Sequence, residues 1–156
     1  MKVLYFTRGQ SPHDLRFTQA LSQTEHQVFV LCLESDHTRS WPEGITEVHW
    51  NGAPADFEWK LTARLVRELK DVIEQVNPDL IHAGPIQRVA FLVAQAKFHP
   101  LVSMSWGSDL LLDAQLNLWW SMVTRYALTC TDVLVADCES VINKARKFGF
   151  RSNAYK

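Results

Sequence analysis

Short apolar runs alternate along the chain with longer segments in which apolar residues recur every three or four positions. Most of these runs are apolar on both faces, which is typical of strands buried in a parallel sheet, whereas residues 45–50 alternate between apolar and polar. They predict six strands, over residues 2–6, 28–33, 45–50, 79–83, 101–106 and 132–136.

The longer segments between these runs predict helices. Ser11 can cap the first helix, with Asp14 three residues later, as in a capping box. The clearest helix has Asp56 as a cap and ends at Asn77, which precedes a proline. Three more helices are expected over 84–97, 107–129 and 137–149, the last capped by Asp137.

Strands that alternate with helices favour a three-layer αβα Rossmann-like sandwich with a mainly parallel, doubly wound sheet. The length of 156 residues fits one domain, over residues 1–156. In such a sheet a ligand binds beyond the carboxyl ends of the strands, where the strand order reverses. We therefore expect a site in the loops that follow the first, fourth, fifth and sixth strands.

Composition narrows the classes of function. Sixteen basic and seventeen acidic residues give a formal net charge of −1, so no nucleic-acid partner is expected. The six glycines form neither GxGxxG nor GxxxxGK[ST], which counts against nicotinamide and P-loop nucleotide binding. No cofactor or metal is expected. The three widely spaced cysteines are typical of reduced thiols, which favours a cytoplasmic protein.

The loops after the first and fourth strands offer small and polar residues. Gly9 precedes a helix start whose free amides could receive an anion, and His13 could act there as a general base or anion donor. The alternative for His13 is a solvated residue in an ordinary capped helix. After the fourth strand, Gly84 allows close approach of a ligand, and Gln87 is expected to point into the crevice from the first helical turn.

The loop after the fifth strand is the most informative. Trp106 offers a stacking face for a sugar or base, Gly107 allows a turn, and Ser108 and Asp109 offer partners for hydroxyl groups. The alternative is that Asp109 caps the next helix and Trp106 packs in the core. Together these loops suit a polyol or phosphorylated ligand better than hydride transfer.

Four segments, in order, resemble the N-terminal domain of retaining glycosyltransferases with the GT-B fold (group one, family four). They are the MKVL start before a glycine-containing loop, NPDLIHA at 77–83, LVSMSWGSDLL at 101–111 and TDVLVADCESV at 131–141. Two positions depart from the family pattern. Gly9 stands alone where the family often has a Gly-Gly pair that contacts donor phosphate, and Trp106 stands where it often has histidine.

The resemblance implies an enzyme that moves a sugar from a nucleotide-sugar co-substrate to a sugar, lipid or small-molecule acceptor with retention. This chain would be the acceptor-side half of the enzyme and would be inactive by itself. Its partner would be a C-terminal donor-binding domain, which this chain lacks. Asp109 is the expected catalytic residue, which would hold or polarise an acceptor hydroxyl. The expected substrate-binding residues are Gly9, His13, Gly84, Gln87, Trp106, Gly107 and Ser108.

Other interpretations stay open at this point. A non-catalytic Rossmann-like binding module would use the apolar helix at 86–96 and the pair Trp119-Trp120 as a partner surface. A nucleotide-sugar epimerase shares the two-domain architecture, but normally needs acids and histidines that we do not place in this sequence. Because many members of the resembling family glycosylate lipid carriers, peripheral contact with a membrane is a further possibility.

Overall fold

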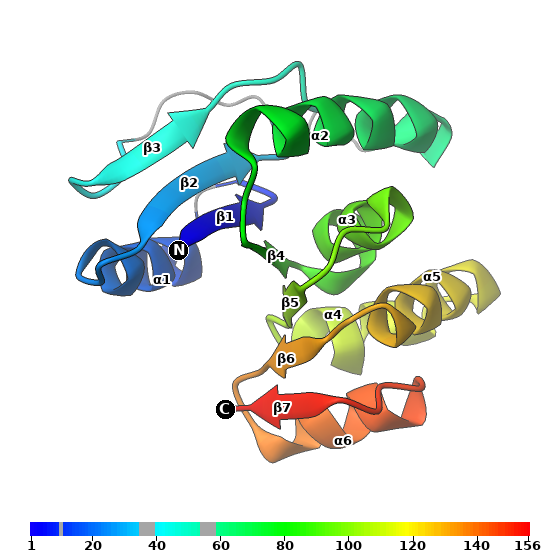
Figure 1. Ribbon diagram of the computed structural model, residues 1–156. Coiled ribbons are helices and arrows are strands. Elements are labelled where there is room, and N and C mark those ends of the chain that lie inside the picture. Colours follow the sequence, from blue (N-terminus) through cyan, green and yellow to red (C-terminus); the bar gives the residue numbers. More distant parts are fainter. Residues whose placement is uncertain (10, 35–39, 54–58) are drawn as a thin grey trace.

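The computed structural model describes residues 1–9, 11–34, 40–53 and 59–156. Within these ranges seven strands form one sheet in the order β3-β2-β1-β4-β5-β6-β7, and all neighbouring strands run parallel (Figure 1). The parallel, doubly wound sheet is as predicted, and β7 extends the six strands expected from the apolar runs. The strands are β1 (Lys2–Thr7), β2 (Gln27–Cys32), β3 (Ile45–Val48), β4 (Leu80–Gly84), β5 (Leu101–Met104), β6 (Val133–Val135) and β7 (Asn153–Tyr155).

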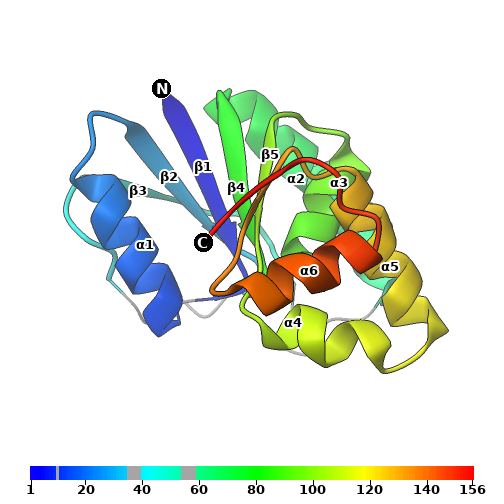
Figure 2. The ribbon, with the colours of Figure 1, turned by 90° about the horizontal axis from the view of Figure 1, so that it is seen from below.

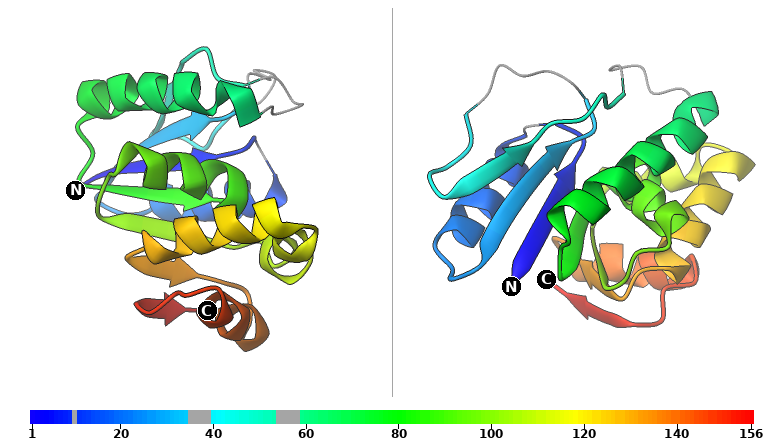
Figure 3. Two further views of the ribbon diagram at one scale, coloured as in Figure 1. Left: turned by 90° about the vertical axis from the view of Figure 1, so that its right-hand side faces the viewer. Right: turned by 45° about the horizontal axis from the view of Figure 1, so that its top comes forward.

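Helices lie on both faces of the sheet, which completes the predicted three-layer sandwich (Figures 1 and 2). One face carries α1 (Pro12–Ser22). In the left panel of Figure 3 the opposite face is in front, and it carries α2 (Thr62–Val76), α3 (Phe91–Ala96), α5 (Leu118–Thr129) and α6 (Glu139–Lys147). Shorter helical pieces are η1 (Trp59–Leu61), the π-helical turn η2 (Ile86–Ala90), α4 (Ser108–Leu111) and η3 (Asp113–Gln115).

The register of the strands decides which side chains meet each layer, because successive residues in a strand point to opposite faces. Leu4 and Ile81 are partners across β1 and β4, and both are buried in the cluster that α2 and α3 complete. One residue further, Tyr5 and His82 are partners on the other face, where the ring of Phe17 from α1 contacts both.

The start of α1 is fixed by the predicted capping box. The backbone N–H of Asp14 donates to Ser11 Oγ at 3.3 Å, and the N–H of Ser11 donates to Asp14 Oδ2 at 2.8 Å. The hydroxyl of buried Tyr5 donates to Asp14 Oδ1 at 2.8 Å. Burial raises the pKa of Tyr5, so the hydroxyl keeps its proton as a donor. This network attaches α1, and the loop that leads into it, to the sheet.

The helix predicted over 107–129 is wrong in its continuity, since the structure divides it into α4, η3 and α5. The break comes at Asn117, whose backbone is extended (φ −164°, ψ 176°) and whose side chain accepts a hydrogen bond from Trp120 N at 3.0 Å. Asparagine favours this capping geometry because its short amide can replace a missing backbone partner. Apolar residues continue through the break, so the pattern gave no sign of it.

Other predicted helix starts also shift. Asp137 is not the cap of α6, because Cys138 takes the N-cap position and no side chain caps the helix there. The helix predicted over 84–97 begins as the π-helical turn η2 and continues as α3. The predicted cap at Asp56 lies outside the described residues, and α2 is described from Thr62.

His82 is a titratable group inside the layer between β4 and α1. Its ring stands edge-on to those of Tyr5 and Phe17, with centroids 5.2 and 5.6 Å away. Its Nε2 has no hydrogen-bond partner within the described ranges. Burial lowers the pKa of His82 from 6.5 to about 4, so the folded protein holds this imidazole neutral.

We predict that His82 makes the protein less stable as the pH falls from 6.5 to about 4. Over this window the unfolded chain binds a proton that the folded chain does not, which costs up to about 1.4 kcal/mol per pH unit. Urea unfolding at a series of pH values measures the free energy of unfolding. Its slope against pH should be smaller for His82→Phe, whose ring can keep the packing. The same change at exposed His26 should leave the slope as it is, and equal slopes for all three proteins would contradict the prediction.

Candidate functional site

The candidate site lies where the strand order reverses, between β1 and β4. Here the chain leaves β1 toward α1 on one face and leaves β4 and β5 toward helices on the other. Gly9 follows β1, Gly84 ends β4 and Gly107 follows β5. The structure thus places the three predicted glycines at the same edge of the sheet.

The reasons for glycine differ between these positions. A Cβ on Gly84 would lie 2.5 Å from the carbonyl oxygen of Met104, so glycine is needed there for β4 and β5 to pack. Gly107 has φ +84°, a conformation that residues with a side chain rarely adopt, and it begins α4. Among the described residues, the nearest atom to a Cβ on Gly9 would be Glu34 Oε2, at 3.7 Å, which is an ordinary contact. Packing explains Gly84, backbone conformation explains Gly107, and neither explains Gly9.

Asp109 is the centre of a buried network. Its Oδ1 accepts hydrogen bonds from Ser105 Oγ at 2.6 Å and from the N–H of Leu110 at 3.0 Å. Its Oδ2 accepts from the N–H of Ile86, the first residue of η2, at 3.1 Å. The residue is 3% exposed. Burial raises the pKa of Asp109, and the three hydrogen bonds oppose that rise. The carboxylate therefore joins the loop after β4 to the loop after β5.

Gln87 reinforces the same junction. Its side-chain amide donates to the backbone oxygen of Asp109 and, at 3.0 Å, to the hydroxyl of Thr124 in α5. Gln87 is buried, with its amide nitrogen bonded inside the protein. The predicted orientation into the crevice is not seen for its amide nitrogen, which turns inward and connects η2, α4 and α5.

A cavity of about 280 Å³ opens beside this junction. It brings together the loops after β1, β4 and β5 with η3 and α5. Four predicted residues line it, namely Gln87, Trp106, Ser108 and Asp109. The remaining lining residues are Arg8, Pro85, Arg88, Asp113, Leu116 and Trp120.

Two guanidinium groups line this cavity together with the carboxyl groups of Asp109 and Asp113. Arg8 forms an ion pair with Glu34, and Arg88 reaches the cavity from η2. Guanidinium groups suit phosphate and carboxylate because their N–H groups form a planar fork. Neither arginine was singled out from the sequence as a site residue, since a lone cation gives little signal before the fold is known. The available signal was their position just after strand ends.

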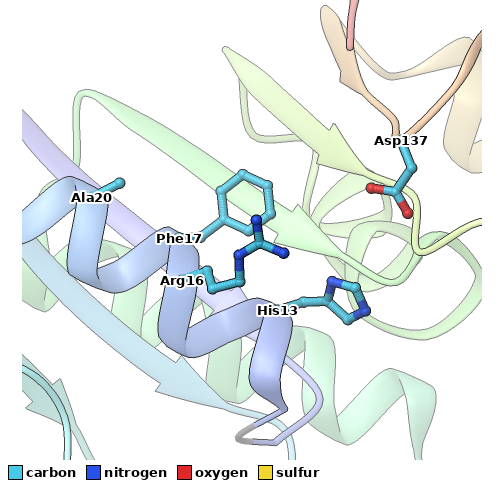
Figure 4. A pocket seen from close by; sticks show the side chains of 5 residues that line it. All are labelled: His13, Arg16, Phe17, Ala20 and Asp137. Atoms are coloured by element: carbon cyan, nitrogen blue, oxygen red, sulfur yellow. The ribbon is translucent and has the colours of Figure 1, made fainter.

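A second cavity, of about 290 Å³, lies between α1 and the residue Asp137 that follows β6. Figure 4 shows His13 of α1 facing Asp137 across this cavity, with Arg16 and Phe17 beside them; Ala20 completes the lining. The ring of His13 stacks on that of Trp106, with centroids 6.3 Å apart and planes at 23°. Trp106 thus separates His13 from the cavity that Ser108 lines.

Trp106 also has a polar atom to offer. Its Nε1 is buried and has no hydrogen-bond partner among the residues that the structure describes. The same residues include no group of three His, Cys, Asp or Glu side chains that could hold a metal ion. In the described part of the chain, no helix is long and apolar enough to cross a membrane.

Solved structures with a similar fold include a sucrose-phosphate synthase and UDP-N-acetylglucosamine 2-epimerases. Sucrose-phosphate synthase from Thermosynechococcus elongatus aligns with a TM-score of 0.69 and 12% identity, over 99% of this chain and 47% of that one. UDP-N-acetylglucosamine 2-epimerase from Rickettsia bellii aligns with a TM-score of 0.62 and 15% identity, over 99% and 44%. The UDP-GlcNAc 2-epimerase of Neisseria meningitidis, bound to UDP-GlcNAc, gives 0.57 and 15%, over 94% and 43%.

At these identities the likeness shows the fold alone, and this chain spans less than half the length of each of the three proteins. No curated protein matches the chain in sequence. The family model described as "Glycosyl transferase 4-like" matches residues 2–138, which is most of the chain. The resemblance seen in the sequence is therefore confirmed, and the chain belongs to the glycosyl transferase 4-like family.

Proposed function

We propose that this chain is the acceptor-side half of a glycosyltransferase that moves a sugar from a nucleotide-sugar to an acceptor with retention. The observation that supports this most is the cavity at the carboxyl ends of β1, β4 and β5, where Arg8, Arg88, Ser108 and Trp106 converge in a chain of this family. A fold neighbour solved with UDP-GlcNAc bound supports a nucleotide-sugar as the class of donor.

The chemistry needs charge stabilisation and positioning more than a nucleophile. As the nucleoside diphosphate leaves, negative charge grows on its phosphates and the sugar gains oxocarbenium character. Preorganised donors at such a place lower the barrier because they need no reorganisation during the reaction. In our proposal Arg8 and Arg88 bind an anionic group of donor or acceptor, and the amides near Gly9 approach the diphosphate. Trp106 forms a wall of the sugar pocket.

Asp109 has two roles in this proposal. It positions the loops after β4 and β5 through the three hydrogen bonds that its carboxylate accepts. Since Oδ2 accepts only one of these, a lone pair on Oδ2 is left for an acceptor hydroxyl. Ser108 is exposed next to it, at the cavity surface. The hydroxyl and the carboxylate together would hold the attacking oxygen of the acceptor.

The proposal is tested by incubating the full-length gene product with a panel of UDP-, GDP- and ADP-sugars and candidate acceptors. We expect acceptor-dependent release of a nucleoside diphosphate and, by NMR, a product with the donor's anomeric configuration. The 156-residue chain alone should not turn over. An epimerised nucleotide-sugar formed without acceptor would favour the epimerase instead. Absence of turnover with every donor would favour the non-catalytic binding module.

We predict that Asp109→Asn lowers turnover by about 100-fold or more, because it removes a charge from the reacting centre and sets an amide against a neighbouring donor. The free energy of unfolding should also fall, by about 1–3 kcal/mol, because a buried hydrogen bond is lost. Steady-state kinetics and urea unfolding measure the two effects. Asp71→Asn, on the exposed side of α2, is the matched control. Unchanged turnover in a folded Asp109→Asn protein would remove Asp109 from the site.

We predict that Arg88→Gln raises the KM of the anionic substrate about tenfold or more, because a hydrogen bond to a charged group contributes about 1.5–3 kcal/mol. Arg8→Gln should act in the same direction, since both side chains line the cavity. Arg67→Gln changes an exposed arginine of α2 and serves as the control. Should the cavity variants and the control have equal KM values for every substrate, the cavity would not be the anion site.

A further inference from the structure

Another cavity, of about 350 Å³, lies at the opposite edge of the sheet from the candidate site, and we call it the distal cavity. Its lining comes from the end of α5 and from the segments that lead into β6 and β7, so it stands at the amino ends of those strands. The loop from α6 to β7, in red, passes beside the end of α5 (Figure 2). A ligand bound here would not compete with one at the carboxyl ends of β1, β4 and β5.

Gly149 allows the two segments that form the distal cavity to meet closely. Its φ of +100°, which residues with a side chain rarely adopt, turns the chain after α6. A Cβ at this position would lie 3.5 Å from Thr129 Cγ2 and 3.9 Å from Arg125 Cγ. The turn therefore sets the loop from α6 to β7 against the end of α5, and Arg151 and Ser152 line the same cavity as Arg125.

Two guanidinium groups line the distal cavity without a carboxylate. Arg125 comes from α5 and Arg151 from the loop before β7. Among the described residues neither arginine forms an ion pair, and no Asp or Glu is part of the lining. The carboxylate of Asp132, just before β6, is engaged elsewhere, because its Oδ2 contacts the ring of His99 and accepts from the N–H of Leu101, both at 2.7 Å. The positive charge of the cavity is therefore not balanced by the protein.

The ends of two helices weaken this positive charge but do not cancel it. α5 ends at Thr129 and α6 at Lys147, and each helix C-terminus is equivalent to about −0.5 charge. Both ends together amount to about −1, against a full positive charge on each guanidinium group. The last turn of α6 also has cations of its own, Lys144, Arg146 and Lys147. The distal cavity is thus electropositive in a chain whose net charge is −1.

We propose that the distal cavity binds the phosphate group of a small ligand. A guanidinium group recognises oxyanions because it presents parallel N–H donors. One such fork is sufficient for a carboxylate, whereas two forks that converge from different segments suit the larger number of terminal oxygens on a phosphate. The hydroxyl of Ser152 has no hydrogen-bond partner among the described residues and adds a further donor. In the described part of the chain no aromatic ring lines the cavity, so the ligand needs no nucleobase.

The test titrates the isotopically labelled whole chain with inorganic phosphate and, separately, with glycerol phosphate, at constant ionic strength. These probes represent free phosphate and a phosphate monoester, and the tighter binder shows which of the two the cavity takes. Amide NMR spectra follow the backbone N–H groups of Gly149, Arg151 and Ser152, which belong to the cavity lining. The shifts of these signals give a dissociation constant for this cavity alone.

The double variant Arg125→Gln/Arg151→Gln removes both forks. The matched control, Arg67→Gln/Lys70→Gln, removes the same charge from the exposed side of α2. All four side chains are exposed, so both variants are expected to fold, and circular dichroism with thermal unfolding verifies this.

We expect saturable shifts with at least one probe in the native chain and in the control. The double variant should raise the dissociation constant at least about tenfold, because charge-assisted hydrogen bonds are about twice as strong as neutral ones. Added potassium chloride should weaken the binding, since exposed charges are screened. Absence of saturable shifts with both probes would overturn the inference, and so would an equal loss in the double variant and the control.

This inference does not rest on the proposed function, and the two can fail separately. Both probes can also reach Arg8 and Arg88 in the candidate cavity, where the amides of Ile86 and Ser108 report binding. Shifts confined to those two amides would overturn the distal site and leave the proposed function as it is. Conversely, saturable shifts at Gly149 in a protein that transfers no sugar would keep the distal site alone.

Discussion

The buried carboxylate of Asp109 is the constraint on which the candidate site depends. It accepts hydrogen bonds from the hydroxyl of Ser105 and from the N–H groups of Ile86 and Leu110, so one side chain connects two strand-end loops. Without this carboxylate, the N–H groups of Ile86 and Leu110 would lose a hydrogen-bond partner inside the protein, which is costly. The carboxylate that we propose to contact the acceptor is therefore also the group that holds the two loops together beside the cavity.

The fold could be predicted from the sequence because its signals are local. A strand that is buried on both faces has a run of apolar residues. The capping box of Ser11 and Asp14 depends on two residues only three positions apart. The break at Asn117 gave no such signal, because apolar residues continue on both sides of it. Asp137 and Cys138 are adjacent, so the choice between them as a cap depends on how the chain leaves β6.

The candidate site could be predicted less completely, because its members meet only through the sheet. The parallel register places the strand ends together, and this rule found the loops that contain Trp106, Ser108 and Asp109. It could not show that Gly84 is needed for packing against Met104, a contact across two strands. Nor could it single out Arg88, whose place at the cavity follows from the π-helical turn in which it lies.

The division of the segment from 107 to 129 into α4, η3 and α5 shapes one side of the cavity. Because the chain ends α4 and restarts at Asn117, Leu116 and Trp120 close one side of the cavity while Leu118 and Met122 stay in solvent. Local rules that fail at one place commonly mark function. Here a single break in a predicted helix accounts for one wall of the proposed site.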